Sequence, residues 1–396
     1  MRRQSVIQLV CLVVTALAAP GAWAGVADVL RSPRFNHLEL APIAPALANT
    51  VASTYPVASA SSSVTYTYNP ALDTLERQAG VSGPILGERA ETIGKGQFDV
   101  AVSYSYVHLT TINGDDLGAL VNRPRVNGKT VIFPVAGGGG VTLKDGRFTN
   151  FLPVRVVADL DVEAHILAPS LTYGVTPDLD VNLTLPLLRT SLDVRANTQA
   201  PDPRFPQFAL QNGRVLHDVK EDSDDAVGVG DLLLRTKYVL ARGSWVDVAA
   251  ALGRSLPTGS RDNLQGTGTT RVQPTLVFSH VFADWVEPLV NVGVDVNADD
   301  ASRSVARWAV GATAQVIDRL SATLVFFGRH SFDPLTDPIA TPFFFQVERT
   351  DEFDASIGSR WRFAESGFAG LNVIVPMNGQ GLRPDVIPTF EIEYAF

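Results

Sequence analysis

The sequence TFEIEYAF at residues 389–396 has an apolar side chain at every second position up to the C-terminus. Successive side chains of a strand point to opposite faces, so this period of two predicts a strand with one apolar and one acidic face. The apolar face consists of Phe390, Ile392, Tyr394 and Phe396, and the other face carries Glu391 and Glu393. An apolar face toward lipid and an acidic face toward a lumen are typical of outer-membrane barrels. A terminal Phe on such a strand resembles the signal that directs barrel assembly, and we assign that role to the four apolar residues.

The N-terminus predicts export. Two arginines precede an apolar run over residues 6–19, and AWA at 22–24 has the small-x-small form of a cleavage site. Residues 1–24 are therefore expected to be a secretory signal peptide. The only cysteine, Cys11, lies inside this segment, so the mature protein is expected to have no disulfide, metal thiolate or thiol nucleophile.

Composition excludes several classes of protein. No run of about 18 apolar residues follows residue 24, so membrane crossing by helices is not expected. The formal net charge of -9 argues against nucleic acid and anionic membrane surfaces as partners. A hydrophobic content of 45% suits both a soluble core and a barrel, so periodicity must decide between them.

Alternation recurs from residue 97 to the C-terminus in segments of about ten to fifteen residues. Short turns are found near residues 176, 242, 284, 318 and 365, and mostly longer connections at 112–156, 196–226, 259–270, 331–350 and 379–384. Short turns are periplasmic and long loops extracellular in such barrels. The sequence thus predicts an all-β, transmembrane, antiparallel up-and-down barrel of about 12 strands over residues 96–396. A soluble antiparallel sandwich is the alternative.

Two irregular regions are expected. In the segment 157–175 the apolar positions change parity near Pro169, which predicts a β-bulge. Residues 25–95 do not alternate and predict an irregular periplasmic arm or a plug. Within this arm, Asn69-Pro70 predicts the start of a short helix near residues 70–78.

Three motifs resemble one family. NPALDTLERQAGVSGPILGERAETIGKGQFDVAVSYSY (69–106), VGVGDLLLRTKYVL (227–240) and LPTGSRDNLQGTGTTRVQP (256–274) are similar to the outer-membrane proteins grouped as "putative MetA-pathway of phenol degradation". The resemblance runs from about residue 69 to the C-terminus. It implies a barrel for uptake of small organic molecules, with aromatic compounds among them, and it supplies no catalytic residues.

Charged side chains of both signs fall on the predicted inward face. They are Asp99, Asp231, Arg235, Lys237, Asp247, Arg254, Arg271, Asp295, Arg307, Arg329, Asp354, Arg360, Glu391 and Glu393. Unpaired charges in a dry lumen are very costly, so these residues either line a wet channel or pair into a network that fills the lumen.

Other polar clusters have simpler interpretations. Gly137–Gly140 lacks the Gly-Lys-Ser/Thr of a phosphate-binding loop and is expected in an external loop. The acidic run 221–225 is also expected on an external loop, where bridging by divalent ions to lipopolysaccharide is the alternative to simple solvation. His165, with Asp159, Asp161 and Glu163 near it on the expected lumen face, is the best candidate general base for a hydrolase.

The sequence therefore predicts a porin-like passive channel in the outer membrane of a Gram-negative bacterium. A closed structural or surface barrel and an outer-membrane hydrolase are the alternatives. The expected partners are outer-membrane lipid and lipopolysaccharide, the barrel assembly machinery and a small-molecule solute. No cofactor or metal is implied.

Overall fold

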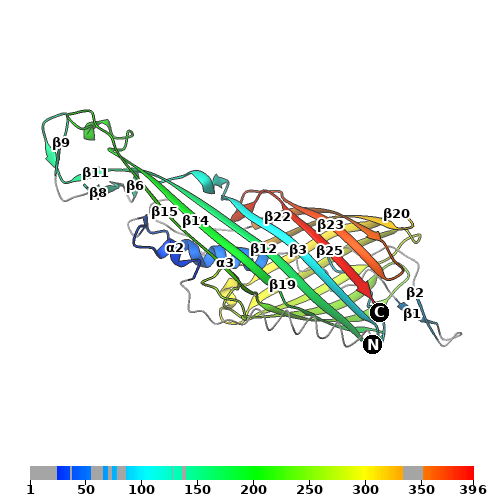
Figure 1. The fold of residues 1–396 in the computed structure, drawn as a ribbon. Helices are drawn as coiled ribbons and strands as arrows, with labels where there is room; N and C mark the ends of the chain where they lie inside the picture. Colours follow the sequence, from blue (N-terminus) through cyan, green and yellow to red (C-terminus); the bar gives the residue numbers. More distant parts are fainter. Residues whose placement is uncertain are drawn as a thin grey trace.

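The computed structural model describes residues 25–35, 38–54, 66–69, 74–77, 86–126, 128–135, 140–332 and 351–396. Most of them form one closed antiparallel barrel (Figure 1). Its strands are β3 (Phe98–Ile112), β12 (Arg155–Thr176), β13 (Leu179–Thr184), β14 (Leu187–Ala200), β15 (Leu216–Val229), β16 (Leu232–Arg242), β17 (Asp247–Leu256), β18 (Arg271–Ser279), β19 (Val286–Asn297), β20 (Val305–Ile317), β21 (Leu320–Ser331), β22 (Asp351–Arg362), β23 (Gly367–Pro376) and β25 (Ile387–Ala395). The expected signal peptide lies outside the described residues.

Two pairs of these segments act as single strands of the wall. β13 continues into β14 after a break at 185–186, and β15 continues into β16 after a break at 230–231. The breaks face each other, because the amide of Gly230 donates to the carbonyl of Pro186 at 2.7 Å. β14 pairs with β15 and β13 with β16. Within the described residues, the wall therefore has the twelve strands expected from the sequence.

Smaller elements surround the wall. The short strands are β1 (Tyr66–Asn69), β2 (Thr74–Arg77), β4 (Asp115–Asp116), β5 (Leu120–Val121), β6 (Arg125–Val126), β7 (Lys129–Thr130), β8 (Ile132–Pro134), β9 (Val141–Thr142), β10 (Phe148–Thr149), β11 (Phe151–Pro153) and β24 (Leu382–Pro384). The helices are α2 (Asp28–Arg31), α3 (Ala44–Thr54) and the 3₁₀ helices η2 (Ala41–Ile43), η3 (Leu117–Ala119), η4 (Pro206–Phe208) and η5 (Ala301–Arg303). None of the described helices is long and apolar enough to cross a membrane.

The outer face of the wall is apolar. Leu171, Leu324 and Ile357 are 42%, 44% and 61% exposed, although large aliphatic side chains in a soluble core would be covered. Next to the short turns, Trp245 and Trp285 form part of an exposed aromatic girdle. An apolar band with an aromatic rim is what a lipid-facing barrel requires. This surface excludes the soluble sandwich.

Along β12 the apolar and polar residues exchange faces, although the register with β3 continues without a shift. The register of β12 with β3 runs without a shift from Tyr173 opposite Phe98 to Val162 opposite Leu109, so the bulge predicted near Pro169 is wrong. Even-numbered residues stay inward throughout. From Pro169 toward the short turn at 176–179, the outward residues of β12 are apolar. From Pro169 toward residue 155, which we call the upper part of the strand, the outward residues are mostly polar and the inward ones are apolar. The reason is that the inward face of this upper part packs against the N-terminal arm, whereas its outward face lies beyond the apolar band of the barrel.

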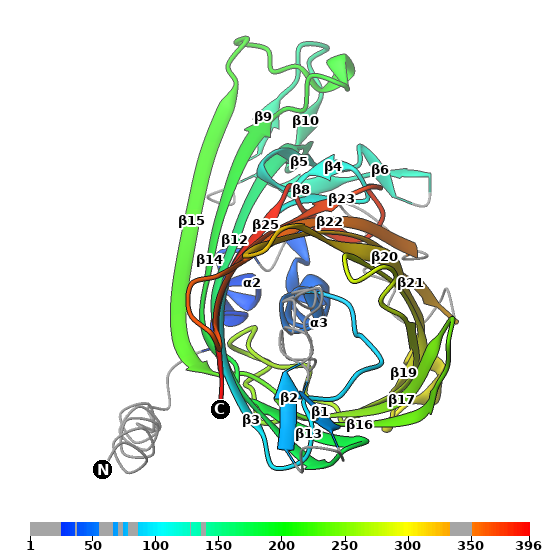
Figure 2. The same ribbon diagram turned by 90° about the vertical axis from the view of Figure 1, so that its right-hand side faces the viewer.

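The inward apolar residues of the upper wall cover the N-terminal arm. Leu30 of α2 and Leu47 of α3 are at most 1% exposed and share one hydrophobic core with Val156, Leu160 and Leu192. Figure 2 shows both helices inside the ring of strands. Burial of this apolar surface fixes the arm within the lumen.

The helix expected near residues 70–78 is not observed where the structure describes the chain. Instead β2 pairs with β1 in a two-stranded hairpin, with Asn69 opposite Thr74. The sequence of β1, YTYN, consists largely of aromatic and β-branched residues that favour strands, and Asn69-Pro70 is also a common turn dipeptide. Residues 74–77 of the expected helix are therefore a strand, and residues 70–73 and 78 lie outside the described residues.

Candidate functional site

Residues 86–97, which we call the lumen segment, precede β3 and lie inside the ring of strands (Figure 2). Their backbone is held by side chains of the wall. The amide of Ala90 donates to Ser279 Oγ at 2.9 Å, and the amide of Ile93 donates to Asp180 Oδ2 at 3.0 Å. Asn291 forms two further bonds, accepting from the amide of Glu88 at 2.8 Å and donating to its carbonyl at 2.9 Å. Polar wall side chains thus replace water as partners of the segment.

Charged wall residues also bind the lumen segment. Lys237, 1% exposed, donates from Nζ to the carbonyl oxygens of Arg89 and Glu91 at 3.2 and 2.6 Å. Arg235 forms an ion pair with Glu88. Arg89 Nη2 lies 3.3 Å from Glu287 Oε2 of β19. Two of the charges that the sequence places in the lumen, Arg235 and Lys237, are therefore engaged with the segment.

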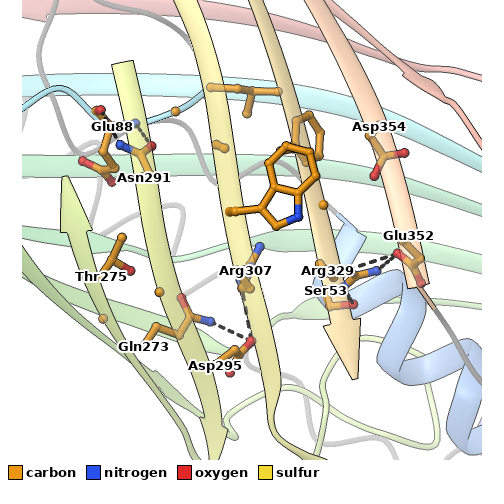
Figure 3. Close-up of a pocket in the computed structure, with 18 of the residues that line it drawn as sticks. Ser53, Glu88, Gln273, Thr275, Asn291, Asp295, Arg307, Arg329, Glu352 and Asp354 are labelled. Carbon is orange, nitrogen blue, oxygen red and sulfur yellow. Dashed lines mark hydrogen bonds and ion pairs between the residues drawn. The ribbon is translucent and has the colours of Figure 1, made fainter. Parts of the chain in front are cut away.

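A cavity of about 260 Å³ lies above the lumen segment, between α3 and the wall. One part of its lining is apolar and includes Leu86, Val325, Phe327, Ile374 and Ile387. The other part is a charged belt, defined as Arg271, Asp295, Arg307, Arg329, Glu352, Asp354 and Arg383. Figure 3 shows Arg307 and Arg329 from neighbouring strands beside this cavity.

The charged belt is a chain of shared ion pairs. Asp295 accepts from Arg271 Nε at 2.8 Å and from Gln273 Nε2 at 3.2 Å, while Arg307 lies 3.6 Å away. Glu352 accepts from Arg329 Nε at 3.0 Å and from Arg383 at 2.9 Å. Asp354 also pairs with Arg383. Arg329 in addition donates to Ser53 of α3 at 2.9 Å, which connects the arm to the belt.

Other predicted lumen residues join strands and do not border the cavity. Arg360, 4% exposed, pairs with both Glu391 and Glu393 and so connects β22 to β25. Asp99 is also buried on this side of the lumen. Such fully desolvated charges are retained only in dense networks of pairs. This part of the lumen matches the filled-network interpretation.

Two buried aspartates hold loops and turns. Asp231 accepts from the amides of Gly259 and Thr267 at 3.0 and 2.8 Å and from Thr267 Oγ1 at 2.7 Å, so it fixes the 257–270 connection. Asp247 accepts from the amide of Gly243 at 3.0 Å and lies 2.9 Å from His280 Nδ1.

Arg254 does not lie in the lumen. Arg254 and Leu252 point to the same face of β17, and both are exposed. The residues on either side of Arg254, Gly253 and Ser255, face the cavity. The prediction that Arg254 is inward is therefore wrong. The physical reason is its even position, which places it on the outer face at the upper end of the strand.

The histidine cluster also lies outside. His165 is on the outward face of β12 and bonds through Nδ1 to the Tyr104 hydroxyl at 2.8 Å. His108 lies 2.9 Å from Asp161, and Glu163 accepts from Tyr106 at 2.6 Å. Ligand atoms of His108, Asp161 and Glu163 lie within 4.8 Å of one another, a spacing that a metal ion can bridge. The expected lumen position of His165 is wrong, because its parity carries it outward above the apolar band.

The acidic run 221–225 lies on β15, whereas an external loop was expected. Glu221 and Asp225 pair with Arg195 and Arg189 of β14 at 3.0 and 3.5 Å. Asp222 lies 3.6 Å from Arg34 of the arm. Cross-strand charge pairs support a strand beyond the apolar band, where the simple alternation of a membrane strand is lost. Gly137–Gly139 lie outside the described residues.

Several residues of the candidate site were not among the charges predicted to face the lumen. They are Glu88, Arg89, Asp180, Glu287, Glu352 and Arg383. Glu287 and Glu352 share the parity of Asp295 and Asp354 on the same strands, a signal that was available. Glu88 and Arg89 lie outside the alternating region, so no periodic pattern could place them in the lumen.

The geometry is that of a lipid-facing barrel with a polar, partly filled lumen. Residues 134–326 match the family described as "Putative MetA-pathway of phenol degradation". This match confirms the resemblance expected from the sequence motifs. No curated protein matches the sequence at a significant level.

Solved structures of similar fold include an outer membrane channel from Pseudomonas putida F1, 12% identical, with a TM-score of 0.47 over 78% of this chain and 98% of that one. The Pseudomonas putida toluene transporter TodX is 11% identical, with a TM-score of 0.35 over 86% of this chain and 96% of its own. A Pseudomonas aeruginosa FadL homologue is 11% identical, with a TM-score of 0.35 over 77% and 90%. These identities and TM-scores are too low to assign a solute.

Proposed function

We propose that this protein is a passive channel in the bacterial outer membrane for small organic solutes, with aromatic compounds as the solute class. The observation that carries the proposal is the cavity of about 260 Å³ inside a closed, lipid-facing barrel. The family description, which refers to phenol degradation, supports aromatic compounds. Outer-membrane lipid, lipopolysaccharide and the barrel assembly machinery are the proposed partners of the barrel itself.

The lumen segment is the proposed barrier to diffusion. A solute that enters from the side of the long loops passes the helices α2 and α3 before it reaches the charged belt, and the lumen segment lies beneath the belt (Figure 1). Hydrogen bonds from wall side chains and the ion pairs of Glu88 and Arg89 hold the segment. Each neutral hydrogen bond contributes a net of about 1 kcal/mol, and each bond to a charged group about 1.5–3 kcal/mol. Displacement of the segment from the wall would join the cavity to the periplasmic end of the barrel.

A closed structural barrel is the second candidate. The observation in its favour is that the arm, the lumen segment and the Arg360 network occupy much of the lumen. For the hydrolase, the outward position of His165 removes the candidate base from the lumen.

A reversible crosslink of the lumen segment distinguishes the two candidates. The variant Ala90→Cys/Ser279→Cys joins the segment to β18, because the Ala90 amide lies 2.9 Å from Ser279 Oγ. The predicted mature chain has no other cysteine. We expect single-channel conductance in planar bilayers to be low in the oxidised form and to rise when the disulfide is reduced.

The matched control crosslinks two wall strands only. Thr313 and Thr323 face each other across β20 and β21 with hydroxyls 3.0 Å apart, so Thr313→Cys/Thr323→Cys should leave conductance independent of reductant. If the folded wild type shows no conductance in either redox condition, the channel proposal fails and the structural barrel is favoured.

A further inference from the structure

The cavity carries an excess of positive charge. Its lining contains five arginines, namely Arg235, Arg271, Arg307, Arg329 and Arg383. It contains four carboxylates, namely Glu88, Asp295, Glu352 and Asp354. One cation is therefore left over in a chain whose formal net charge is -9. A local charge opposite to that of the whole molecule points to a ligand of negative charge.

Arg307 is the side chain that carries the excess. Arg235 pairs with Glu88, and Arg329 and Arg383 share Glu352 and Asp354. Arg307 Nη1 lies 3.6 Å from Asp295 Oδ2, which is too long for a strong hydrogen bond. The oxygens of Asp295 already accept hydrogen bonds from Arg271 and Gln273 at shorter distances. Its side chain is 43% exposed, compared with 16% for Arg271 and 22% for Arg329. The Arg307 guanidinium is thus available from the cavity.

The position of Arg307 in the sheet adds to the argument. It stands directly opposite Arg329 in the register of β20 and β21, and both side chains face inward (Figure 3). Like charges directly opposite each other on one face destabilise a sheet. An anion between them would relieve this repulsion. A guanidinium also binds a carboxylate through two parallel hydrogen bonds.

The remainder of the lining is apolar, which limits the class of anion. Phe327 and Val325 lie on the same inward face of β21 as Arg329, and Leu86, Ile374 and Ile387 complete the apolar part. A volume of about 260 Å³ is smaller than that of drug-sized sites, which begin near ~300 Å³. The site therefore fits a molecule with one small apolar body and one anionic group.

We propose that the cavity binds small organic anions, with Arg307 holding a carboxylate and the Phe327 side of the cavity holding an aromatic body. That the cavity binds organic anions is inferred from the cavity alone. That the protein transports them rests on the proposed function. Benzoate is the probe for this class. Benzamide is its neutral counterpart of the same shape, and acetate carries the carboxylate without the apolar body.

Calorimetric titration of the full-length protein in detergent tests binding. We expect benzoate to bind at least about tenfold more tightly than benzamide or acetate, and Arg307→Gln to weaken benzoate binding by about tenfold without affecting benzamide. Arg214→Gln removes the same charge from an exposed loop and should leave benzoate binding unchanged. Equal affinity for benzoate and benzamide, equal affinity for benzoate and acetate, or equal effects of the two variants would overturn the proposal.

Conductance separates this inference from the proposed function. In planar bilayers with a sodium benzoate gradient, we expect the reversal potential to show preference for benzoate over sodium, and Arg307→Gln to reduce it. Conductance without that preference, combined with unselective titrations, refutes the organic-anion site and leaves the channel. Selective benzoate binding by a protein without conductance refutes the channel and supports the site.

Discussion

Lys237 is a buried cation that binds the lumen segment. Its Nζ donates to the carbonyls of Arg89 and Glu91, and Asp180 stands opposite it in the register of β13 and β16. Lys237→Met removes the donor and leaves two buried carbonyls without it. We expect a loss of about 1–3 kcal/mol of unfolding free energy, measured by urea titration in lipid, and a higher frequency of open-channel events in planar bilayers.

Lys95 provides the matched control for Lys237. It belongs to the same lumen segment but its side chain is exposed. Lys95→Met should change neither stability nor channel opening. A Lys237→Met protein that unfolds at wild-type urea concentrations and opens no more often would show that the ammonium does not hold the segment.

At the scale of elements, the connection between β17 and β18 folds into the molecule. Leu264 is fully buried, and Gln265 donates to the carbonyl of Ala226 at 3.2 Å. Asp231 accepts three hydrogen bonds from this connection. Asp231→Ala should release it, and trypsin should then cleave after the exposed Arg261 at least several-fold faster.

The control for that substitution is Asp300→Ala. Asp300 accepts from Ser302 in the short exposed turn that contains η5, so its loss leaves the β17–β18 connection in place. Cleavage after Arg261 at the wild-type rate in Asp231→Ala would contradict the anchoring role. The readout is the appearance of the two fragments on a gel over time.

Sequence analysis correctly predicts the strands that have lipid on one face and a polar environment on the other. β25 and β21 have lipid outside and a polar lumen inside, so their alternation is visible. The upper part of β12 has an apolar inner face against the arm, which inverts the pattern and produced the false bulge. β15 is polar on much of both faces beyond the apolar band, so it was assigned to a loop.

The candidate site was partly predictable for the same reason. Inward charges such as Asp295 and Arg307 follow directly from strand parity, and Arg254 was misplaced because its parity was misjudged. The partners of these charges in residues 86–97 depend on long-range contacts, for example between Glu88 and Asn291, which no local pattern encodes. Sequence alone therefore located the polar wall but left open what fills the lumen.

At the scale of the whole molecule, the two ends of the barrel differ, and we expect this difference to set its orientation in the membrane. The short turns and the aromatic girdle lie at one end of the barrel, and β14 and β15 extend beyond the apolar band at the other (Figure 1). Asp193 is exposed on β14 beyond the band, Trp245 is 77% exposed in a short turn, and Leu324 is 44% exposed within the band. We expect these three positions to report the cell exterior, the periplasm and the lipid, respectively.

Cysteine labelling with a membrane-impermeant maleimide tests this orientation, because the described residues contain no cysteine. We expect Asp193→Cys to react in intact cells, Trp245→Cys to react only after the outer membrane is permeabilised, and Leu324→Cys to remain unlabelled in both conditions because lipid covers it. If Trp245→Cys reacts in intact cells and Asp193→Cys only after permeabilisation, the barrel has the opposite orientation. The lumen segment would then be the first barrier that an incoming solute meets. Labelling of Leu324→Cys in intact membranes would instead refute the lipid-facing band.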